Sequence, residues 1–191
     1  MIEGVSDGTS RVERFLAHLD GLTGVTEPRI WPVESTRPGS EGLTAIHYSH
    51  VPEPGTSLGF TYGLSRGDDE RWRDGKPELC IRVASDDPSW TLAAAFLAED
   101  LRGRCAFRYG DVLEFGQPVT AGSTMDGFVV SAPAVADQRD ARIDVGEELP
   151  ITLVGLYPTH RSERAFVQEH GLHAFWRLDW DPFDVRRPAA A

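Results

Sequence analysis

The segment Pro150–Leu156 (PITLVGL) constrains the fold more than any other part of the chain. It is apolar at nearly every position, and successive side chains of a strand point to opposite faces of a sheet. Both faces of such a strand must therefore be covered, which is typical of the centre of a sheet rather than its edge. The sequence thus predicts a layered protein with Pro150–Leu156 near the middle of its sheet.

Other short apolar runs predict further strands. In one of them, Leu79, Ile81 and Val83 alternate with their neighbours and share one face. The predicted strands are Leu43–His50, Leu58–Leu64, Glu78–Ala84, Val112–Phe115 and Asp126–Ala132, in addition to Pro150–Leu156. The Pro- and Gly-rich segment Glu27–Gly42 is expected to be a loop or an extended connection, and the acidic segment Asp137–Glu148 a loop.

Helices are predicted between these strands. Ser10 and Glu13 have the spacing of a capping box, and an apolar stripe follows at Val12, Phe15, Leu16 and Leu19. Further helices are expected from Asp87 to about Gly103, over Arg161–Glu169 and over Leu172–Leu178. Because helices and strands do not alternate regularly, we expect an α+β protein, a mixed β-sheet with helices packed on it.

The length of 191 residues suggests a single compact domain. We expect residues 1–42 to hold the N-terminal helix and a Pro/Gly-rich connection packed on that domain. Residues 43–187 would form the domain itself, and residues 188–191 a short tail.

The charge narrows the class of partner. The formal net charge is 19 − 30 = −11, which disfavours phosphate backbones and anionic membranes. A partner with a basic surface is favoured, because opposite fields speed encounter, although the charge could serve solubility alone. The N-terminal residues lack the apolar core of a signal peptide, and no apolar run is long enough to span a bilayer. We therefore expect a cytoplasmic protein.

No motif for catalysis, metal or cofactor binding is evident. His47 and His50 are three residues apart on a predicted strand, so their side chains should not converge. Cys80 and Cys105 are too few for a four-cysteine zinc site, and the sequence has no GxSxG elbow and no phosphate-binding glycine loop. We expect no enzyme, no cofactor and no metal, with a small metal-dependent hydrolase as the alternative.

Two polar–aromatic segments are candidates for protein binding. The first follows a predicted strand and contains Tyr62, Asp68, Asp69, Glu70, Arg71 and Trp72; the second contains Tyr157 and Arg161. Aromatic and Arg side chains supply much of the binding energy of interfaces, and carboxylates can receive a basic surface. The alternative is that Tyr62, Trp72 and Tyr157 are wedges packed against the core.

The order of several segments resembles the suppressor-of-fused family over roughly His47 to Arg187. The strongest pieces are YGLS (62–65), GDVLEFG (110–116) and LYPTHRSER (156–164). The weaker ones are IHYSHVPE, PELCIRV, WTLAAAFLAEDL, MDGFVVSAP and DPFDVRR, all in the same order.

This resemblance implies a non-enzymatic protein-binding domain similar to the N-terminal lobe of the two-lobed animal members. Many single-domain bacterial members are thought to be immunity proteins that neutralise toxins. In the animal members an acidic residue shortly after GLS contacts the partner, and Asp68 or Asp69 lies in that region here. We therefore expect a cytoplasmic immunity protein that covers a basic toxin surface, with a general adaptor as the alternative. The oligomeric state is left open.

Overall fold

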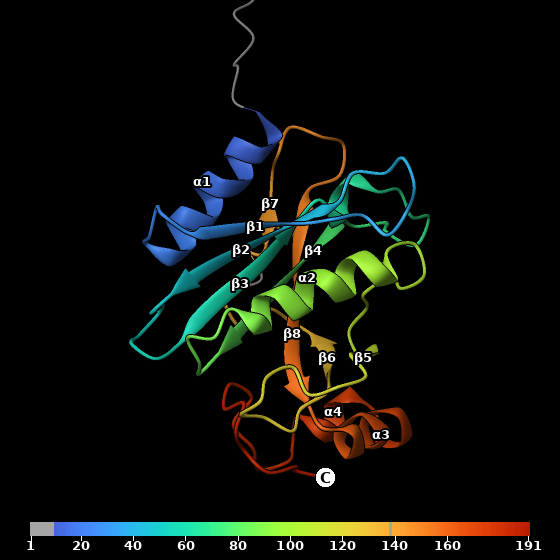
Figure 1. Ribbon diagram of the computed structural model, residues 1–191. Helices are drawn as coiled ribbons and strands as arrows, with labels where there is room; N and C mark the ends of the chain where they lie inside the picture. Colours follow the sequence, from blue (N-terminus) through green and yellow to red (C-terminus); the bar gives the residue numbers. More distant parts are fainter. Residues whose placement is uncertain (1–9, 138) are drawn as a thin grey trace, which may run out of the picture.

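A mixed eight-stranded sheet forms the centre of the protein (Figure 1). The computed structural model describes residues 10–137 and 139–191. The sheet order is β1-β2-β3-β4-β8-β6-β5, and β7 pairs separately with β8. All pairs are antiparallel except β4 with β8. The strands are β1 (Arg29–Val33), β2 (Leu43–Ser49), β3 (Ser57–Tyr62), β4 (Lys76–Val83), β5 (Val112–Glu114), β6 (Gly127–Ser131), β7 (Arg142–Ile143) and β8 (Ile151–Thr159).

Strand β8 lies between β4 and β6, which confirms the prediction of a central strand. Eight of its nine residues are buried. At Gly155 a Cβ would lie 2.5 Å from the carbonyl oxygen of Ala132, so only glycine allows the backbones to approach this closely. The strand continues past its predicted end, through Tyr157 to Thr159, because β6 pairs with that extension.

The helices lie where the sequence predicts them, with small differences at their ends. They are α1 (Arg11–Thr23), α2 (Ser89–Leu101), α3 (Arg161–His170) and α4 (Leu172–Phe175), and a 3-10 turn, η1, spans Leu64–Arg66. The predicted capping box of α1 is confirmed: Ser10 Oγ accepts the N–H of Glu13, whose carboxylate accepts the N–H of Ser10.

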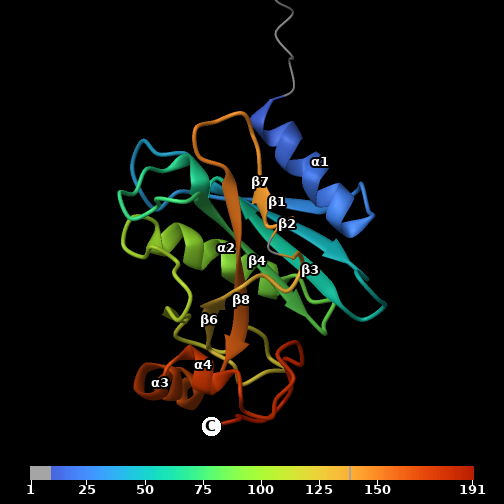
Figure 2. The ribbon, with the colours of Figure 1, turned by 180° about the vertical axis from the view of Figure 1, so that it is seen from behind.

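The two faces of the sheet bury different helices. On one face, Ala45, Leu79 and Ile81 pack against α2, including the fully buried Trp90. On the other face, Phe15 and Leu19 of α1 pack in a cluster with residues of β2, β3, β7 and β8. Figure 2 shows this second side, where β8 crosses in front of α2. A third, aromatic-rich cluster joins α3, α4 and the C-terminal segment to β6 and β8.

Two predicted loops contain strands. Segment Glu27–Gly42 includes β1, which pairs with β2 at the edge of the sheet, where Pro32 costs no ladder hydrogen bond if its nitrogen faces outward. Segment Asp137–Glu148 includes the two-residue β7, which pairs with Thr152 and Ile151 of β8. Both strands are short, and pairing with a neighbour rather than local propensity defines them. Helix α4 is also shorter than the predicted Leu172–Leu178.

Candidate protein-binding surface

The segment between β3 and β4, residues 63–75, carries most of the predicted binding residues, and an internal anchor holds its start. The anchor is Glu78, the third residue of β4, whose side chain is 0% exposed. Its Oε1 accepts the N–H of Gly63 at 2.7 Å, the N–H of Ser65 at 3.0 Å and the hydroxyl of Ser65 at 2.6 Å. Its Oε2 accepts the hydroxyl of Thr61 at 2.7 Å. Four donors therefore fix the turn η1 onto β4.

The geometry of this turn explains why the carboxylate is needed. A buried carboxylate is costly unless hydrogen bonds replace its water, and here backbone and hydroxyl donors do so. Gly63 has φ of 117°, a value that disfavours side chains, and it places its N–H toward Glu78. Arg11 of α1 adds a further tie, since its Nη2 donates to Ser65 Oγ at 2.7 Å. The start of the segment is thus held from two sides.

The three acidic residues of the segment differ in their surroundings. Asp68 is highly exposed and lies 3.0 Å from Lys76 Nζ. The side chain of Asp69 is only 7% exposed and accepts Arg71 Nε at 2.7 Å, and this hydrogen bond lowers the pKa of Asp69. Glu70 is exposed, and no ion pair or side-chain hydrogen bond joins it to another described residue. Asp68 and Glu70 are therefore the charges available to a partner.

These acids line a hollow of about 420 Å³. Trp72, Lys76 and Leu149 complete its lining. We call this hollow, with Asp68, Asp69 and Glu70, the acidic hollow. Its shape depends on the internal anchor at Glu78, because the same segment runs from η1 to β4.

The second half of the segment is fastened to the chain that follows α2. Arg71 donates to the carbonyl oxygens of Arg104 and Gly103, both at 3.3 Å. The Trp72 indole is 9% exposed and donates to the carbonyl oxygen of Ala106 at 3.3 Å. Trp72 is therefore a core wedge that positions the acids beside it.

The other two aromatic candidates are also buried. Tyr62 is 4% exposed, packs 5.0 Å from the Phe15 ring and lies under the guanidinium of Arg66 at 4.9 Å. Tyr157 is 6% exposed, and its hydroxyl donates to the carbonyl oxygen of Ala132 at 2.8 Å. Tyr62, Trp72 and Tyr157 are thus all packed against the core, as the alternative interpretation of the sequence expected.

The two predicted binding segments do not meet. Lys76 at the start of β4 pairs with Ile151, six residues before Tyr157 on β8, which corresponds to about 20 Å along a strand. Arg161 lies beyond Tyr157, exposed in the first turn of α3. The structure thus separates Tyr157 and Arg161 from the acidic hollow, and a binding role for either stays a prediction.

Sequence reasoning missed Glu78, the residue that organises the site. The signal was present: Glu78 stands beside Leu79 in the mostly apolar strand PELCIRV, where a buried charge is costly unless it has partners. The partners could not be identified, since Gly63 and Ser65 contribute backbone groups whose direction depends on the turn.

The histidine and cysteine side chains lie apart. His47 is buried, with its Nδ1 2.9 Å from Thr91 Oγ1, and burial lowers its pKa. His50 is exposed and lies 3.3 Å from Asp86. Burial raises the pKa of Cys105 to about 11, and both cysteines are free thiols. Within residues 10–137 and 139–191, no three His, Cys, Asp or Glu side chains gather as a metal site would require. None of the helices in these ranges is both long and apolar enough to cross a bilayer.

Comparison with solved structures identifies the fold. A suppressor of fused homologue from Neisseria gonorrhoeae superposes with a TM-score of 0.74 at 18% identity, covering 94% of this chain and 96% of that one. A chain of the Sufu–Fu complex gives a TM-score of 0.72 at 12% identity, covering 95% and 93%. Drosophila Suppressor of Fused gives 0.72 at 10% identity, covering 95% of this chain and 51% of its own length.

The sequence carries the same assignment. A comparison with curated protein sequences finds no significant match. The profile of the suppressor of fused protein (SUFU) family, however, matches residues 39–188, which is most of the chain. The chain therefore belongs to the suppressor of fused (SUFU) family.

Proposed function

We propose that this protein is a non-enzymatic binding domain that docks a protein partner with a basic surface on the acidic hollow. Three facts support the proposal. The fold is that of SUFU proteins, and one chain with this fold is part of the Sufu–Fu protein complex. The net charge is −11, which attracts basic surfaces. The hollow presents Asp68 and Glu70 from a firmly anchored segment.

The observation that carries the proposal is the internal anchor at Glu78. An interaction site gains affinity when its contact groups are ordered before binding, since less entropy is lost on association. Here four hydrogen bonds to a buried carboxylate order the turn from which the acidic segment projects.

We further propose that the partner is a toxin and that this chain is a bacterial, cytoplasmic immunity protein. Co-expression tests this role. If the captured partner arrests growth when produced alone, the intact chain should restore growth, and variants of the acidic hollow should restore it less well. A partner that is harmless by itself would instead favour the adaptor role.

The binding experiment begins with capture of the partner from native cytosol and its purification. Association kinetics are then compared for the wild type and the Asp68→Asn/Glu70→Gln variant at low ionic strength. Asp69 stays unchanged, because its bond to Arg71 shapes the segment. We expect the association rate to fall about tenfold, as happens when charges at the rim of an interface are removed.

A matched control removes charge elsewhere. Glu27, Glu34 and Asp179 are exposed and make no side-chain hydrogen bond with another described residue. The Glu27→Gln/Asp179→Asn and Glu34→Gln/Asp179→Asn variants each change the net charge by the same two units. Equal slowing in these controls and in the Asp68/Glu70 variant would refute a specific role for the hollow, leaving only the overall charge.

A further inference from the structure

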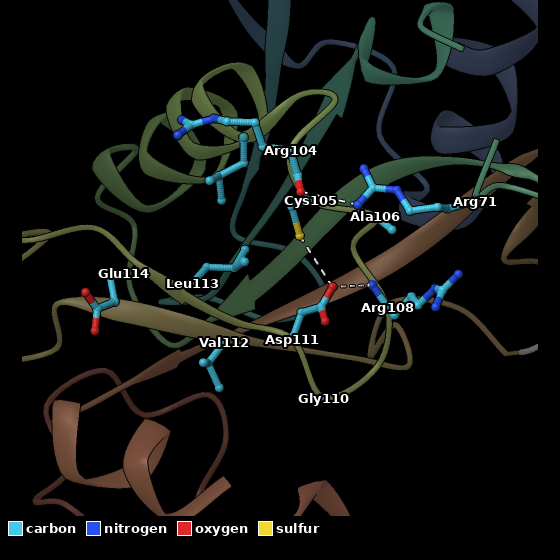
Figure 3. A pocket seen from close by; sticks show the side chains of 11 residues that line it. Arg71, Arg104, Cys105, Ala106, Arg108, Gly110, Asp111, Val112, Leu113 and Glu114 are labelled. Carbon is cyan, nitrogen blue, oxygen red and sulfur yellow. Dashed lines mark hydrogen bonds between the residues drawn. The ribbon is translucent and has the colours of Figure 1, made fainter. Parts of the chain in front are cut away.

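A second pocket, of about 620 Å³, opens between the chain that follows α2 and the edge strand β5 (Figure 3). One wall is formed by Arg104 to Arg108, and the other by Gly110 to Glu114. Its volume lies within the usual range for ligand pockets. The acidic hollow has a different lining, so the two sites share no lining residue.

Arginine side chains surround this second pocket. Arg71, Arg104 and Arg108 line it, and an adjoining hollow of about 240 Å³ shares Arg71 and Arg108 and adds Arg73 and Arg142. We call these five residues the arginine face. The same two hollows are also lined by Asp74, Asp111 and Glu114, so five arginines stand beside three acidic side chains in a chain with a net charge of −11.

Most of this positive charge is not neutralised locally. Arg71 pairs with Asp69, and Arg104 pairs with Asp100 at 2.7 Å. The other three arginines of the face are exposed, and none lies within ion-pair distance of an acidic side chain of residues 10–137 or 139–191; they are Arg73, Arg108 and Arg142.

The acid nearest the middle of the pocket has other partners. Asp111 Oδ2 accepts the N–H of Arg108 at 2.8 Å and lies 3.4 Å from the Cys105 thiol (Figure 3). This carboxylate closes the local turn instead of pairing with a guanidinium. Glu114 and Asp74 line the two hollows as well, but neither lies within ion-pair distance of Arg73, Arg108 or Arg142, so these three guanidiniums can pair with an external anion.

The wall formed by β5 also offers backbone groups. Within residues 10–137 and 139–191, it is the last strand on its side of the sheet and pairs only with β6. The carbonyl oxygen of Asp111 accepts the N–H of Val130, and the N–H of Phe115 donates to the carbonyl oxygen of Asp126, so with a period of two Leu113 also faces β6. The N–H and C=O of Val112 and Glu114 therefore point to the open side, and both residues line the pocket.

We propose that this pocket binds an extended acidic segment of a protein partner, which adds a strand to β5 and places its carboxylates on the arginine face. Backbone hydrogen bonds to an open edge give affinity without sequence preference, while side chains of alternate residues give specificity. Arginine forks suit carboxylates. An extended peptide satisfies both walls, whereas a nucleic acid has no backbone groups that match a strand edge and is repelled by the chain as a whole. This site goes beyond the proposed function, because it binds an acidic segment, whereas the acidic hollow binds a basic surface.

The test uses fluorescent octapeptides of alternating Glu and Val, or of alternating Lys and Val, at low ionic strength. They are titrated with the full chain carrying Asp68→Asn/Glu70→Gln, so that the acidic hollow does not attract the Lys–Val peptide. Fluorescence anisotropy should show the Glu–Val peptide binding at least about tenfold more tightly than the Lys–Val peptide. The Arg108→Glu/Arg142→Glu variant should weaken Glu–Val binding about tenfold or more. The Arg177→Glu/Arg186→Glu variant, with the same charge change at exposed arginines of the C-terminal region, should weaken it much less.

A chemical change in the peptide tests strand pairing without altering the protein. A Glu–Val peptide N-methylated at alternate amides keeps its charges but loses donors on one edge, and we expect its binding to fall about tenfold or more. Equal affinity of the Glu–Val and Lys–Val peptides, or equal weakening by both arginine variants, would overturn the proposal. So would undiminished binding of the methylated peptide, or tighter, Arg108-dependent binding of a single-stranded oligonucleotide.

Discussion

Two buried carboxylates, Glu78 and Glu163, hold opposite ends of the central strands, and they are stabilised in different ways. Both are 0% exposed. Glu78 is surrounded by hydroxyls and backbone N–H groups of the β3 end and η1. Glu163, in the first turn of α3, forms an ion pair with Arg187 and accepts the N–H groups of His160 and Ala190.

We call the Glu78 end the surface end, because it holds the segment that carries the acidic hollow. We call the Glu163 end the closing end, because it holds the C-terminal segment. Glu78 is satisfied without a guanidinium, and Arg71 joins the segment after η1 to the chain beyond α2. Glu163 and Arg187 instead fasten the C-terminal segment to α3, next to the aromatic cluster of Phe175, Trp176 and Trp180. We infer that the partner with a basic surface binds at the Glu78 end, while the Glu163–Arg187 pair serves stability.

The largest predicted effect is at the closing end. Glu163→Ala leaves the Arg187 guanidinium, in a residue only 7% exposed, without its carboxylate. Breaking a buried pair from one side typically costs about 3–5 kcal/mol of the free energy of unfolding. Urea denaturation of the variant measures this loss. The Glu163→Gln/Arg187→Met variant, which removes both charges, should lose less, and an equal or larger loss would contradict the assigned role of the ion pair.

A smaller loss is predicted at the surface end. Glu78→Ala leaves the N–H groups of Gly63 and Ser65 without their acceptor but exposes no unpaired cation. We expect the free energy of unfolding to fall by about 1–3 kcal/mol. Hydrogen exchange of residues 63–67 should also quicken more than that of α3. If α3 quickens as much as η1, the two ends do not respond separately and the comparison fails.

The stability contributed by Glu163 should also depend on pH. Burial opposes ionisation of Glu163, but hydrogen bonds from Arg187, Ala190 and His160 hold its pKa below the ordinary value of 4.5. A lowered pKa in the folded state contributes stability above the unfolded pKa, and this part is lost as the pH falls through the folded value. Urea denaturation below about pH 4.5 should therefore show a smaller decline for Glu163→Gln than for the wild type. If the free energy of unfolding declines equally with pH in the two proteins, the ionised Glu163 does not contribute this stability.

The smallest predicted effect concerns Arg71. Its pair with Asp69 is partly exposed, so Arg71→Ala should cost less than about 1 kcal/mol of unfolding free energy. Exchange of the Trp72 amide should nevertheless quicken, because the segment loses its bonds to the carbonyls of Gly103 and Arg104. A large loss of stability, or unchanged exchange of the Trp72 amide, would show that Arg71 does not act by holding this segment locally.

The sequence predicted the framework better than the site, for physical reasons. Pro150–Leu156 and the Ser10–Glu13 box carry local signals, and both predictions are confirmed. Strands β1 and β7 depend on pairing with distant neighbours, so their local sequence reads as loop. The polar segments of the sequence indicate where the acidic hollow lies. The burial of Trp72 and the partners of Glu78 depend on contacts between distant parts of the chain, so the sequence alone does not show them.

The most direct test of the account is hydrogen exchange of the full chain with and without its captured partner. If the partner binds at the acidic hollow, amides of residues 66–77 should exchange more slowly in the complex, while those of α3 and residues 179–187 should be unchanged. Protection confined to α3 and the C-terminal segment would contradict the account, because it would place the partner at the end that Glu163 and Arg187 close.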